Sequence, residues 1–422
     1  MRQYLIIGNS AAGISAIEAI RALDKTSPIT VVTDEDYPAY CRCLISYYLA
    51  GDVKEEAVLY RPQSFYKDNN VTLILNKKVT RVDPKKNRVI CEDKTQLNYD
   101  SLLVATGARP RIPEIKGIKK KGIFGLRTIK DAKDISELLQ LRPAVCVIGG
   151  GLVGLKAAYA LKKRKVDVKV AIKSRQVLSQ MLDSQAAGLV QRRLESNGID
   201  MLMGQDVTEV IGEGEIKAVK LDSGKAFECS LIVVGRGVEP NTDLVKESEI
   251  RIDKGICVDE RMQTSVPNIF SAGDVAQSFD LVLGEPSMNT LWTIAVQQGK
   301  AAGANMAGAG VSYDGSLAMN TTDFFGLPIL SLGLHNVSDS SSGCEELRLM
   351  DEKRDIYKKV IIRGNHVVGA VLVGDIKSGG VMLRMIREKL DISEILDRLL
   401  REDFGYPDIL NTVSDREKMY VG

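Results

Sequence analysis

The sequence predicts an α/β protein with two Rossmann-like dinucleotide-binding domains and a C-terminal α+β domain. Three observations support this fold class. A strand, a glycine-rich turn and a helix occur near the start of the chain, the same pattern returns at Ala144, and paired strands replace it after residue 323. A chain of 422 residues is long enough for two or three domains of ~150 residues each.

The first βαβ unit begins with the apolar run Tyr4–Ile7, which predicts a buried strand. A glycine-rich turn, a helix of small residues to Ala22 and a second strand over Ile29–Val32 follow. Glycines in such a turn let a pyrophosphate approach the positive end of the helix, and an acidic residue about 20 positions later accepts ribose hydroxyls. The predicted dinucleotide-binding residues are Gly8, Ser10, Ala11, Ala12, Gly13, Asp34 and Glu35, with Ser10 in place of the middle glycine.

The second βαβ unit repeats this design with a strand over Ala144–Ile148, a helix to about Lys163 and a strand over 166–172. One glycine-rich turn alone is a weak signal, because tight turns without a ligand also contain glycine. Two turns in the same context favour nucleotide binding. The predicted binding residues here are Gly149, Gly151, Leu152, Val153 and Gly154.

The second strand of this unit ends without the expected acidic residue. Ile172 stands there, followed by Lys173 and Arg175, which can pair with the 2′-phosphate of NADP. A solvated basic turn is the alternative. If the basic residues bind the nucleotide, NADPH is used at least as well as NADH.

Three further apolar strands each run into glycine. The residues that follow them include Thr106, Gly107, Gly237, Gly273 and Asp274. Because ligands of open parallel sheets bind at the carboxyl ends of the strands, these residues are candidates for the same sites.

The C-terminal part has a different pattern. It predicts strands over 357–362 and 367–373 around a turn at Gly364 and Asn365, and then an amphipathic helix over 381–400. This segment is therefore expected to form a separate α+β domain.

Together these motifs resemble the two-dinucleotide-binding flavoprotein reductases: NADH oxidases, coenzyme A-disulfide reductases, rubredoxin reductases and the flavin part of assimilatory nitrite reductase. The resemblance covers nearly the whole chain. It implies that FAD binds at the first glycine loop and NAD(P)H at the second. It also implies an FAD-binding domain over 1–112 and 243–323, an NAD(P)-binding domain over 113–242, and an interface domain over 324–422 through which a homodimer forms.

The resemblance also implies roles for individual residues. Asp34 would bind the FAD ribose, and Asp274 would lie near the ribityl-phosphate arm of FAD. The remaining cofactor contacts implied are Arg42, Val79, Thr106, Gly107, Arg127, Gly237, Gly273, Trp292 and Thr293. Lys156 departs from the family, whose members usually carry glutamate in that helix.

The role of Cys43 distinguishes between two activities of the resembling family. It falls where, by the resemblance, NADH oxidases and coenzyme A-disulfide reductases carry a single catalytic cysteine; a small residue packed beneath the flavin ring is the alternative. A disulfide with Cys41 is not expected, because in a strand the two Cα atoms would be ~6.6 Å apart, at the edge of disulfide geometry. The Cys-x4-Cys motif of the dithiol reductases, with its C-terminal histidine base, is not matched.

The expected function is that of an FAD-dependent NAD(P)H oxidoreductase, which passes electrons to a redox-protein or iron–sulfur partner. The first alternative is a Cys43-assisted NAD(P)H oxidase or coenzyme A-disulfide-type reductase. The second is a non-catalytic flavin-binding subunit.

Composition argues against several other classes. Lys and Arg number 57 and Asp and Glu 55, and the net charge of +2 is too small for a nucleic-acid-binding protein. No apolar run reaches the ~18 residues of a membrane span and no signal-peptide pattern is present, so we expect a cytoplasmic protein. The 7 scattered cysteines and 2 histidines predict neither a disulfide framework nor a metal site.

Overall fold

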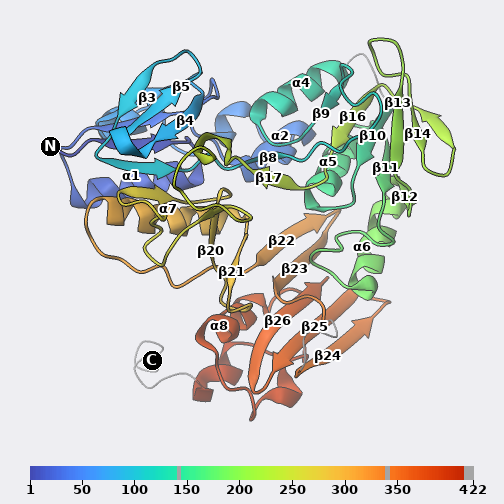
Figure 1. Ribbon diagram of the computed structural model, residues 1–422. Helices are drawn as coiled ribbons and strands as arrows, with labels where there is room; N and C mark the ends of the chain where they lie inside the picture. The colour runs from blue at the N-terminus through green and yellow to red at the C-terminus, as the bar shows by residue number, and fades with distance from the viewer. Residues whose placement is uncertain (140–143, 338–342, 413–422) are drawn as a thin grey trace. The chain divides into compact units, whose positions relative to one another are not determined.

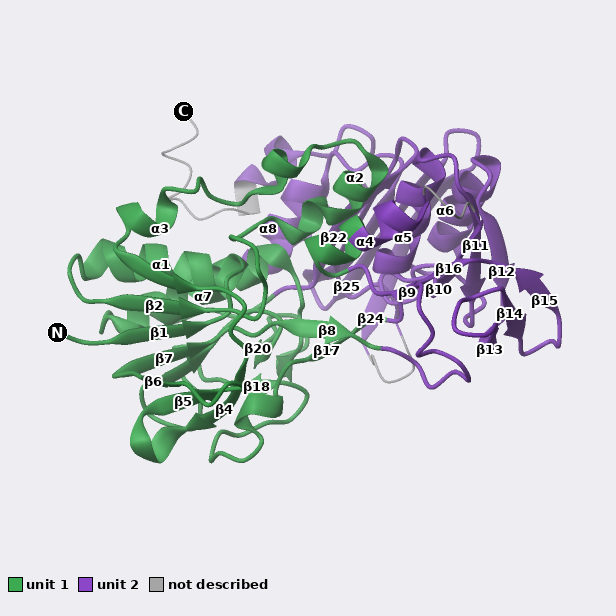
Figure 2. Ribbon diagram, turned by 90° about the horizontal axis from the view of Figure 1, so that it is seen from above, with its two compact units in different colours: residues 1–111, 127–133, 237–316 green, residues 112–126, 134–236, 317–422 purple. Residues whose placement is uncertain are grey.

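The computed structural model describes residues 1–139, 144–337 and 343–412. The chain forms two compact units, shown in different colours in Figure 2. Unit 1 comprises residues 1–111, 127–133 and 237–316, and unit 2 comprises residues 112–126, 134–236 and 317–422. Each unit is therefore assembled from segments that lie far apart in the sequence. The three-domain division with boundaries at 112, 242 and 323 stays a prediction.

Unit 1 is built on a five-stranded parallel sheet (Figure 1). Its order is β19 (Ile269–Ser271), β7 (Ser101–Val104), β1 (Tyr4–Ile7), β2 (Ile29–Val32) and β3 (Val71–Ile74). In the central strand β1, Ile6 lies opposite Val31 on one side and Leu103 on the other. Every residue of β1 and β7 is buried, which is typical of parallel strands that are covered on both faces.

Two layers cover this sheet. Helices α1 (Ala11–Leu23) and α7 (Trp292–Met306) pack on one face, and the antiparallel strands β4 (Val79–Asp83), β5 (Arg88–Cys91) and β6 (Gln96–Asn98) pack on the other. The two helices can approach closely because Gly299 has no side chain. A Cβ at this position would lie 2.3 Å from the carbonyl oxygen of Ala12. The remaining elements of unit 1 are α2 (Ile45–Ala50), α3 (Phe65–Asp68), β8 (Ala108–Pro110), β17 (Val238–Pro240), β18 (Ile256–Cys257), β20 (Ala276–Phe279) and β21 (Pro286–Ser287).

Unit 2 contains a second five-stranded parallel sheet. Its order is β12 (Asp200–Met203), β11 (Asp167–Ile172), β10 (Ala144–Ile148), β16 (Leu231–Val234) and β9 (Ile123–Phe124). Antiparallel strands β13 (Val207–Ile211), β14 (Ala218–Leu221) and β15 (Ala226–Glu228) form a small sheet that packs on it. Helices α5 (Leu152–Lys163) and α6 (Ser184–Ser196) belong to the same unit, and α4 (Ile129–Leu139) begins in the segment 127–133 of unit 1.

A five-stranded antiparallel sheet makes up the C-terminal part of unit 2. Its order is β22 (Met319–Phe324), β23 (Leu327–Gly333), β26 (His366–Val373), β25 (Ile356–Arg363) and β24 (Cys344–Asp351). The predicted fold class is thus confirmed: two parallel Rossmann-like α/β sheets and a C-terminal antiparallel sheet.

The predicted helix over 381–400 is wrong in its length. Helix α8 spans Gly379–Glu388 and ends at Lys389, which has a φ of 50° in the left-handed region. A residue in this conformation terminates a helix because it turns the next peptide away from the helix axis. Beyond it, only the short 3₁₀ segment Leu396–Arg398 lies within the predicted range.

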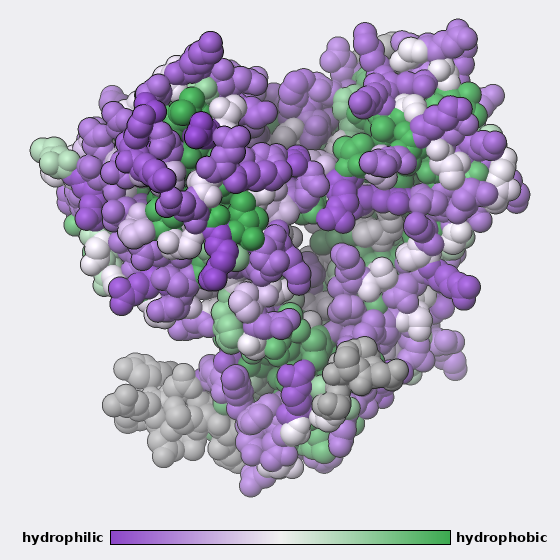
Figure 3. All heavy atoms as spheres, viewed as in Figure 1, coloured by the Kyte–Doolittle hydropathy of each residue, from purple (hydrophilic) through white to green (hydrophobic). Residues whose placement is uncertain are grey.

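Among the residues that the structure describes, no helix is both long and apolar enough to cross a bilayer. The face drawn in Figure 3 carries mainly hydrophilic side chains, with smaller hydrophobic areas between them.

Candidate cofactor site

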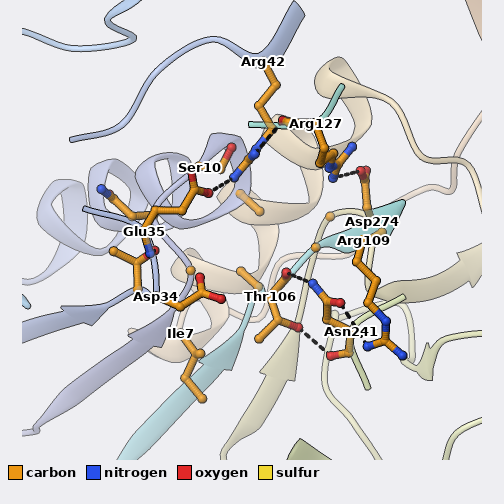
Figure 4. Close-up of a pocket in the computed structure, with 18 of the residues that line it drawn as sticks. Ile7, Ser10, Asp34, Glu35, Arg42, Thr106, Arg109, Arg127, Asn241 and Asp274 are labelled. Atoms are coloured by element: carbon orange, nitrogen blue, oxygen red, sulfur yellow. Dashed lines mark hydrogen bonds and ion pairs between the residues drawn. The ribbon is translucent and has the colours of Figure 1, made fainter. Parts of the chain in front are cut away.

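A cavity of about 770 Å³ opens at the carboxyl edge of the unit 1 sheet (Figure 4). It lies where the loops after β1, β2, β7 and β19 meet, as expected for a ligand site of a parallel sheet. The volume is within the ~300–1,000 Å³ typical of cofactor pockets. The predicted residues that line it are Gly8, Ser10, Ala11, Ala12, Asp34, Glu35, Arg42, Cys43, Val79, Thr106, Gly107, Arg127, Gly273, Asp274 and Trp292.

Some predicted residues lie elsewhere. Gly13 is buried in α1 beneath the loop, and Thr293 is exposed in the first turn of α7. Gly237 belongs to unit 1 but does not line the cavity. The second glycine loop, together with Lys173 and Arg175, belongs to unit 2.

The first glycine loop is a tight turn that only glycine permits. Gly8 has a φ of 117°, and a Cβ there would lie 2.1 Å from the carbonyl oxygen of Ala105. A Cβ on Gly13 would lie 2.1 Å from the carbonyl oxygen of Gly8. Ser10 is the N-cap residue of α1 but its side chain makes no capping hydrogen bond. The first backbone N–H groups of α1 therefore face the cavity, where they can bind a phosphate.

A series of charged side chains borders the cavity. Glu35 forms an ion pair with Arg42, whose Nη1 donates to the carbonyl oxygen of Arg127 at 2.9 Å. Arg127 in turn forms an ion pair with Asp274, with 2.7 Å between Nη2 and Oδ2. Figure 4 shows these side chains lying along one wall of the cavity. They bring together residues from three separate segments of the chain.

Two buried polar groups at this cavity have no protein partner among the described residues. They are the Nδ2 group of Asn9 and the Nε group of Arg127. A buried donor without a partner costs free energy, so such groups point to a ligand acceptor. With the open α1 N-terminus and Asp34 after β2, the residues present fit a dinucleotide such as FAD.

Sequence reasoning missed Asn9 and Asn241. Asn9 accepts a hydrogen bond from the Tyr66 hydroxyl at 2.8 Å, which fixes its side chain beside the glycine loop. Asn241 exchanges two hydrogen bonds of 2.9 Å with Thr106, from Thr106 Oγ1 to its backbone carbonyl and from its own Nδ2 to the Thr106 carbonyl. The position of Asn9 inside the glycine-rich turn is a sequence signal that could have predicted its role. No sequence signal predicts that Asn241 pairs with Thr106.

Cys41 and Cys43 are free thiols, but not for the reason expected. The expected strand does not form here, because Cys41 immediately precedes a 3₁₀ turn over Arg42–Leu44 that contains Cys43. The neighbouring Cys43 thiol lowers the pKa of Cys41, and the Cys41 sulfur together with burial raises the pKa of Cys43. Of the two, Cys43 lines the cavity.

The second glycine loop repeats the geometry of the first. Gly149 has a φ of 117°, and a Cβ there would lie 2.4 Å from the carbonyl oxygen of Gly235. Gly151 is the N-cap of α5. Lys173 and Arg175 are exposed just beyond β11. Lys156 of α5 stands where members of the resembling family usually carry glutamate. Its Nζ donates a hydrogen bond to the carbonyl oxygen of Asp323 at 3.1 Å, so Lys156 contacts the C-terminal part of unit 2.

The fold and the two glycine loops define a class, the proteins with two dinucleotide-binding domains on one chain. The chain belongs to the pyridine nucleotide-disulphide oxidoreductase family, whose model matches residues 2–299. The model of the rubredoxin NAD⁺ reductase C-terminal domain matches residues 319–390. The family consists of NAD(P)H-dependent flavoprotein oxidoreductases.

Individual relatives differ in length. The chain is 33% identical to nitrite reductase [NAD(P)H] of Bacillus subtilis over 93% of its own length but only 48% of that protein. It is 32% identical to the epsilon subunit of NADH-dependent phenylglyoxylate dehydrogenase of Aromatoleum evansii, over 94% of each. It superposes on NADH:rubredoxin oxidoreductase of Clostridium acetobutylicum with a TM-score of 0.78 and 25% identity, over 98% of this chain and 100% of the other.

Proposed function

We propose that this chain binds FAD in the unit 1 cavity, receives hydride from NAD(P)H bound at the second glycine loop, and passes the electrons to a redox-protein or iron–sulfur partner. The observation that carries the proposal is the occurrence of two glycine loops with the same strained geometry, one beside a cavity with unpartnered buried donors. One resident and one exchanging dinucleotide are what hydride transfer between cofactors requires.

The residues of the cavity have separate tasks in this proposal. The α1 N-terminus and Asn9 bind the pyrophosphate, and Asp34 accepts the ribose hydroxyls. Arg127 holds the Asp274 carboxylate in place at the end of β19. Bound FAD would supply the ability to accept two electrons from a nicotinamide and return them singly or in pairs.

The nature of the acceptor follows from two considerations. The interaction with the Cys41 sulfur raises the pKa of Cys43, which disfavours a Cys43 thiolate for disulfide chemistry. Relatives of this chain act as subunits or as reductases of small redox proteins, as the phenylglyoxylate dehydrogenase subunit and the rubredoxin oxidoreductase illustrate. We propose that this chain likewise donates to a protein partner, as a homodimer through residues 324–422 or as a subunit in the cytoplasm.

The Cys43-assisted oxidase or coenzyme A-disulfide-type reductase is the second candidate function. It is favoured by one observation, the position of Cys43 in the lining of the cavity. A Cys43→Ser variant that loses peroxide or disulfide turnover, while NAD(P)H still reduces its flavin, would establish it.

The test of the main proposal has two stages. The flavin released by denaturation is identified, and then the intact protein is titrated anaerobically with NADH and NADPH while the flavin absorbance is followed. We expect FAD and bleaching by a nicotinamide, followed by reoxidation when oxidised rubredoxin or ferredoxin is added. Release of FMN, or no flavin after reconstitution, contradicts the proposal, and FAD that no nicotinamide bleaches supports a non-catalytic subunit.

A further inference from the structure

Three charged residues meet at the carboxyl edge of the first sheet in unit 2. Lys173 follows β11, Asp206 follows β12, and Arg236 follows β16. Both oxygens of the Asp206 carboxylate are engaged. Oδ1 pairs with the Arg236 guanidinium, and Oδ2 lies 3.8 Å from Nζ of Lys173. One carboxylate therefore connects the ends of two strands that lie on opposite sides of β10.

This carboxylate lies beside the second glycine loop. Gly235, the residue before Arg236, packs directly on the loop, because a Cβ on it would lie 2.5 Å from Cα of Gly154. On the other side, the backbone N–H of Gln205 donates to the carbonyl oxygen of Ile172 at 3.0 Å. The segment before Asp206 thus runs along the end of β11, where a Rossmann-like fold binds the adenosine ribose of its nucleotide.

The three residues differ in how firmly they are held. The side chains of Asp206 and Arg236 are 17% and 21% exposed, so this pair is largely withdrawn from solvent. Lys173 is 75% exposed and only loosely associated with the carboxylate. Asp206 is therefore a fixed negative charge among cations, and Lys173 is free to turn toward a ligand.

Such a charge matters for the choice between two nucleotides that differ by one phosphate. NADP(H) carries a 2′-phosphate on the adenosine ribose and NAD(H) carries a hydroxyl there. Lys173 and Arg175 attract the phosphate, whereas a nearby carboxylate repels it and competes for Lys173. A carboxylate can also accept a hydrogen bond from the ribose hydroxyl. Ile172, at the end of β11, cannot accept this hydrogen bond, whereas Asp206, in the loop after β12, carries a carboxylate that can.

We propose that Asp206 is a specificity-determining residue that weakens binding of the nucleotide 2′-phosphate and so keeps NADH as a substrate beside NADPH. This inference rests on the proposed function, because it concerns the nucleotide that reduces the flavin. It assigns discrimination to a residue that lies 33 positions beyond Lys173 in the chain and reaches the ribose site only through the fold.

The test uses Asp206→Asn, which removes the charge but retains an oxygen that can accept from Arg236. Affinities for 2′,5′-ADP and for 5′-AMP are measured by calorimetry, and kcat/KM is measured for NADPH and NADH. We expect the ratio of the NADPH value to the NADH value to rise about fivefold, as for the loss of one surface charge interaction of roughly 1 kcal/mol. The affinity for 2′,5′-ADP should rise by a similar factor, while that for 5′-AMP should not rise.

Asp200→Asn is the matched control. Asp200 begins β12, at the other end of the same strand, and pairs with Lys169 at 2.7 Å. Asp200→Asn should leave unchanged the ratio of kcat/KM for NADPH to that for NADH, and also the ratio of the affinity for 2′,5′-ADP to that for 5′-AMP. An Asp206→Asn ratio equal to that of the wild type, or an equal loss for both nucleotides, overturns the inference. If Asp206→Asn unfolds, Asp206→Ser is measured in the same way and the same outcomes decide.

The two proposals fail differently. If neither nicotinamide reduces the flavin of the wild type, the proposed function is wrong, and the calorimetric comparison of 2′,5′-ADP with 5′-AMP still decides the role of Asp206. If reduction is normal but neither ratio responds to Asp206→Asn, only the inference about Asp206 is wrong.

Discussion

Arg127 and Asp274 form an ion pair with 2.7 Å between Nη2 and Oδ2, although 147 positions separate them in the chain. The pair joins the segment before α4 to the end of β19, and both side chains line the unit 1 cavity. The Nε group of Arg127 is buried and has no partner among the described residues. The pair therefore holds a carboxylate and an unsatisfied donor at fixed positions facing the same cavity.

Removing the Asp274 carboxylate should weaken FAD binding. In Asp274→Asn the ion pair is lost and Arg127 is no longer held in place, so we expect about a tenfold higher Kd for FAD, equivalent to ~1.4 kcal/mol. The Kd is measured by fluorescence as apoprotein is titrated with FAD. Asp83→Asn is the control, because Asp83 pairs with Arg88 at 3.1 Å in a similarly half-buried setting outside the cavity lining. Equal Kd values in the two variants would contradict this role.

Alanine at position 8 should disrupt the first glycine loop. Its Cβ would lie 2.1 Å from a carbonyl oxygen at a backbone angle that alanine rarely adopts. We expect a loss of about 2–4 kcal/mol in the free energy of unfolding, together with loss of flavin. Chemical denaturation and the flavin content after gel filtration measure both. Gly188→Ala in α6, where the nearest atom to the added Cβ is 3.8 Å away, should instead be neutral or stabilising.

Serine at position 43 should leave electron transfer nearly intact. In the proposed function the Cys43 thiol takes no part in electron transfer, so replacing it by a hydroxyl alters only packing, at a cost of ~1 kcal/mol in stability. Anaerobic titration should show two electrons taken up per FAD in both the wild type and Cys43→Ser. Uptake of four electrons by the wild type, or a charge-transfer band that disappears in Cys43→Ser, would show that the thiol takes part.

NADPH should reduce the flavin at least as well as NADH. Ile172 cannot accept the ribose hydroxyls, whereas Lys173 and Arg175 are exposed cations next to the second glycine loop. Stopped-flow reduction with each nucleotide measures the preference, and Lys173→Ala combined with Arg175→Ala should shift it several-fold toward NADH. A strong NADH preference already present in the wild type and unchanged in the double variant would mean that this turn is only solvated surface.

The buried lysine of the C-terminal sheet should make unit 2 sensitive to acid. Lys359 is fully buried, and its Nζ lies 2.7 Å from Oδ2 of Asp183. Burial alone would raise the pKa of Asp183, but hydrogen bonds from Lys359 and Tyr357 outweigh it and hold the pKa below the usual 3.8. Because the folded state lowers this pKa, the stabilisation is complete well above pH 4 and is lost as the pH falls below it.

Removing that carboxylate leaves the buried Lys359 charge with two more distant partners among the described residues, Glu346 at 3.4 Å and the side-chain oxygen of Asn336 at 3.5 Å. Asp183→Asn should therefore cost about 3 kcal/mol of unfolding free energy at pH 7, and less at lower pH. Urea denaturation between pH 3 and pH 7 measures the difference. Asp200→Asn, which removes an exposed ion pair, serves as the control. A difference independent of pH would mean that the Asp183 carboxylate does not titrate in the proposed range.

Local patterns accounted for most of the framework. The strands at Tyr4–Ile7, Ile29–Val32 and Ala144–Ile148 and the two glycine loops could be predicted, because strand burial and the steric demands of glycine act over a few residues. The helix over 381–400 was predicted too long. Its apolar spacing continues past Lys389, and the left-handed conformation that ends the helix there has no glycine to signal it.

The residues of the candidate sites likewise fall into two groups, those that local sequence patterns predict and those that only the tertiary structure brings together. The amino-acid sequence by itself determined that two glycine-rich strand–turn–helix loops are present, and it predicts which of their residues approach a phosphate. Only the tertiary structure decided that Arg127 meets Asp274 and that Asp206 lies between Lys173 and Arg236. The reason is physical: carboxyl ends of parallel strands gather at one edge of a sheet, so residues distant in the chain become neighbours there, and their charges act on a ligand together.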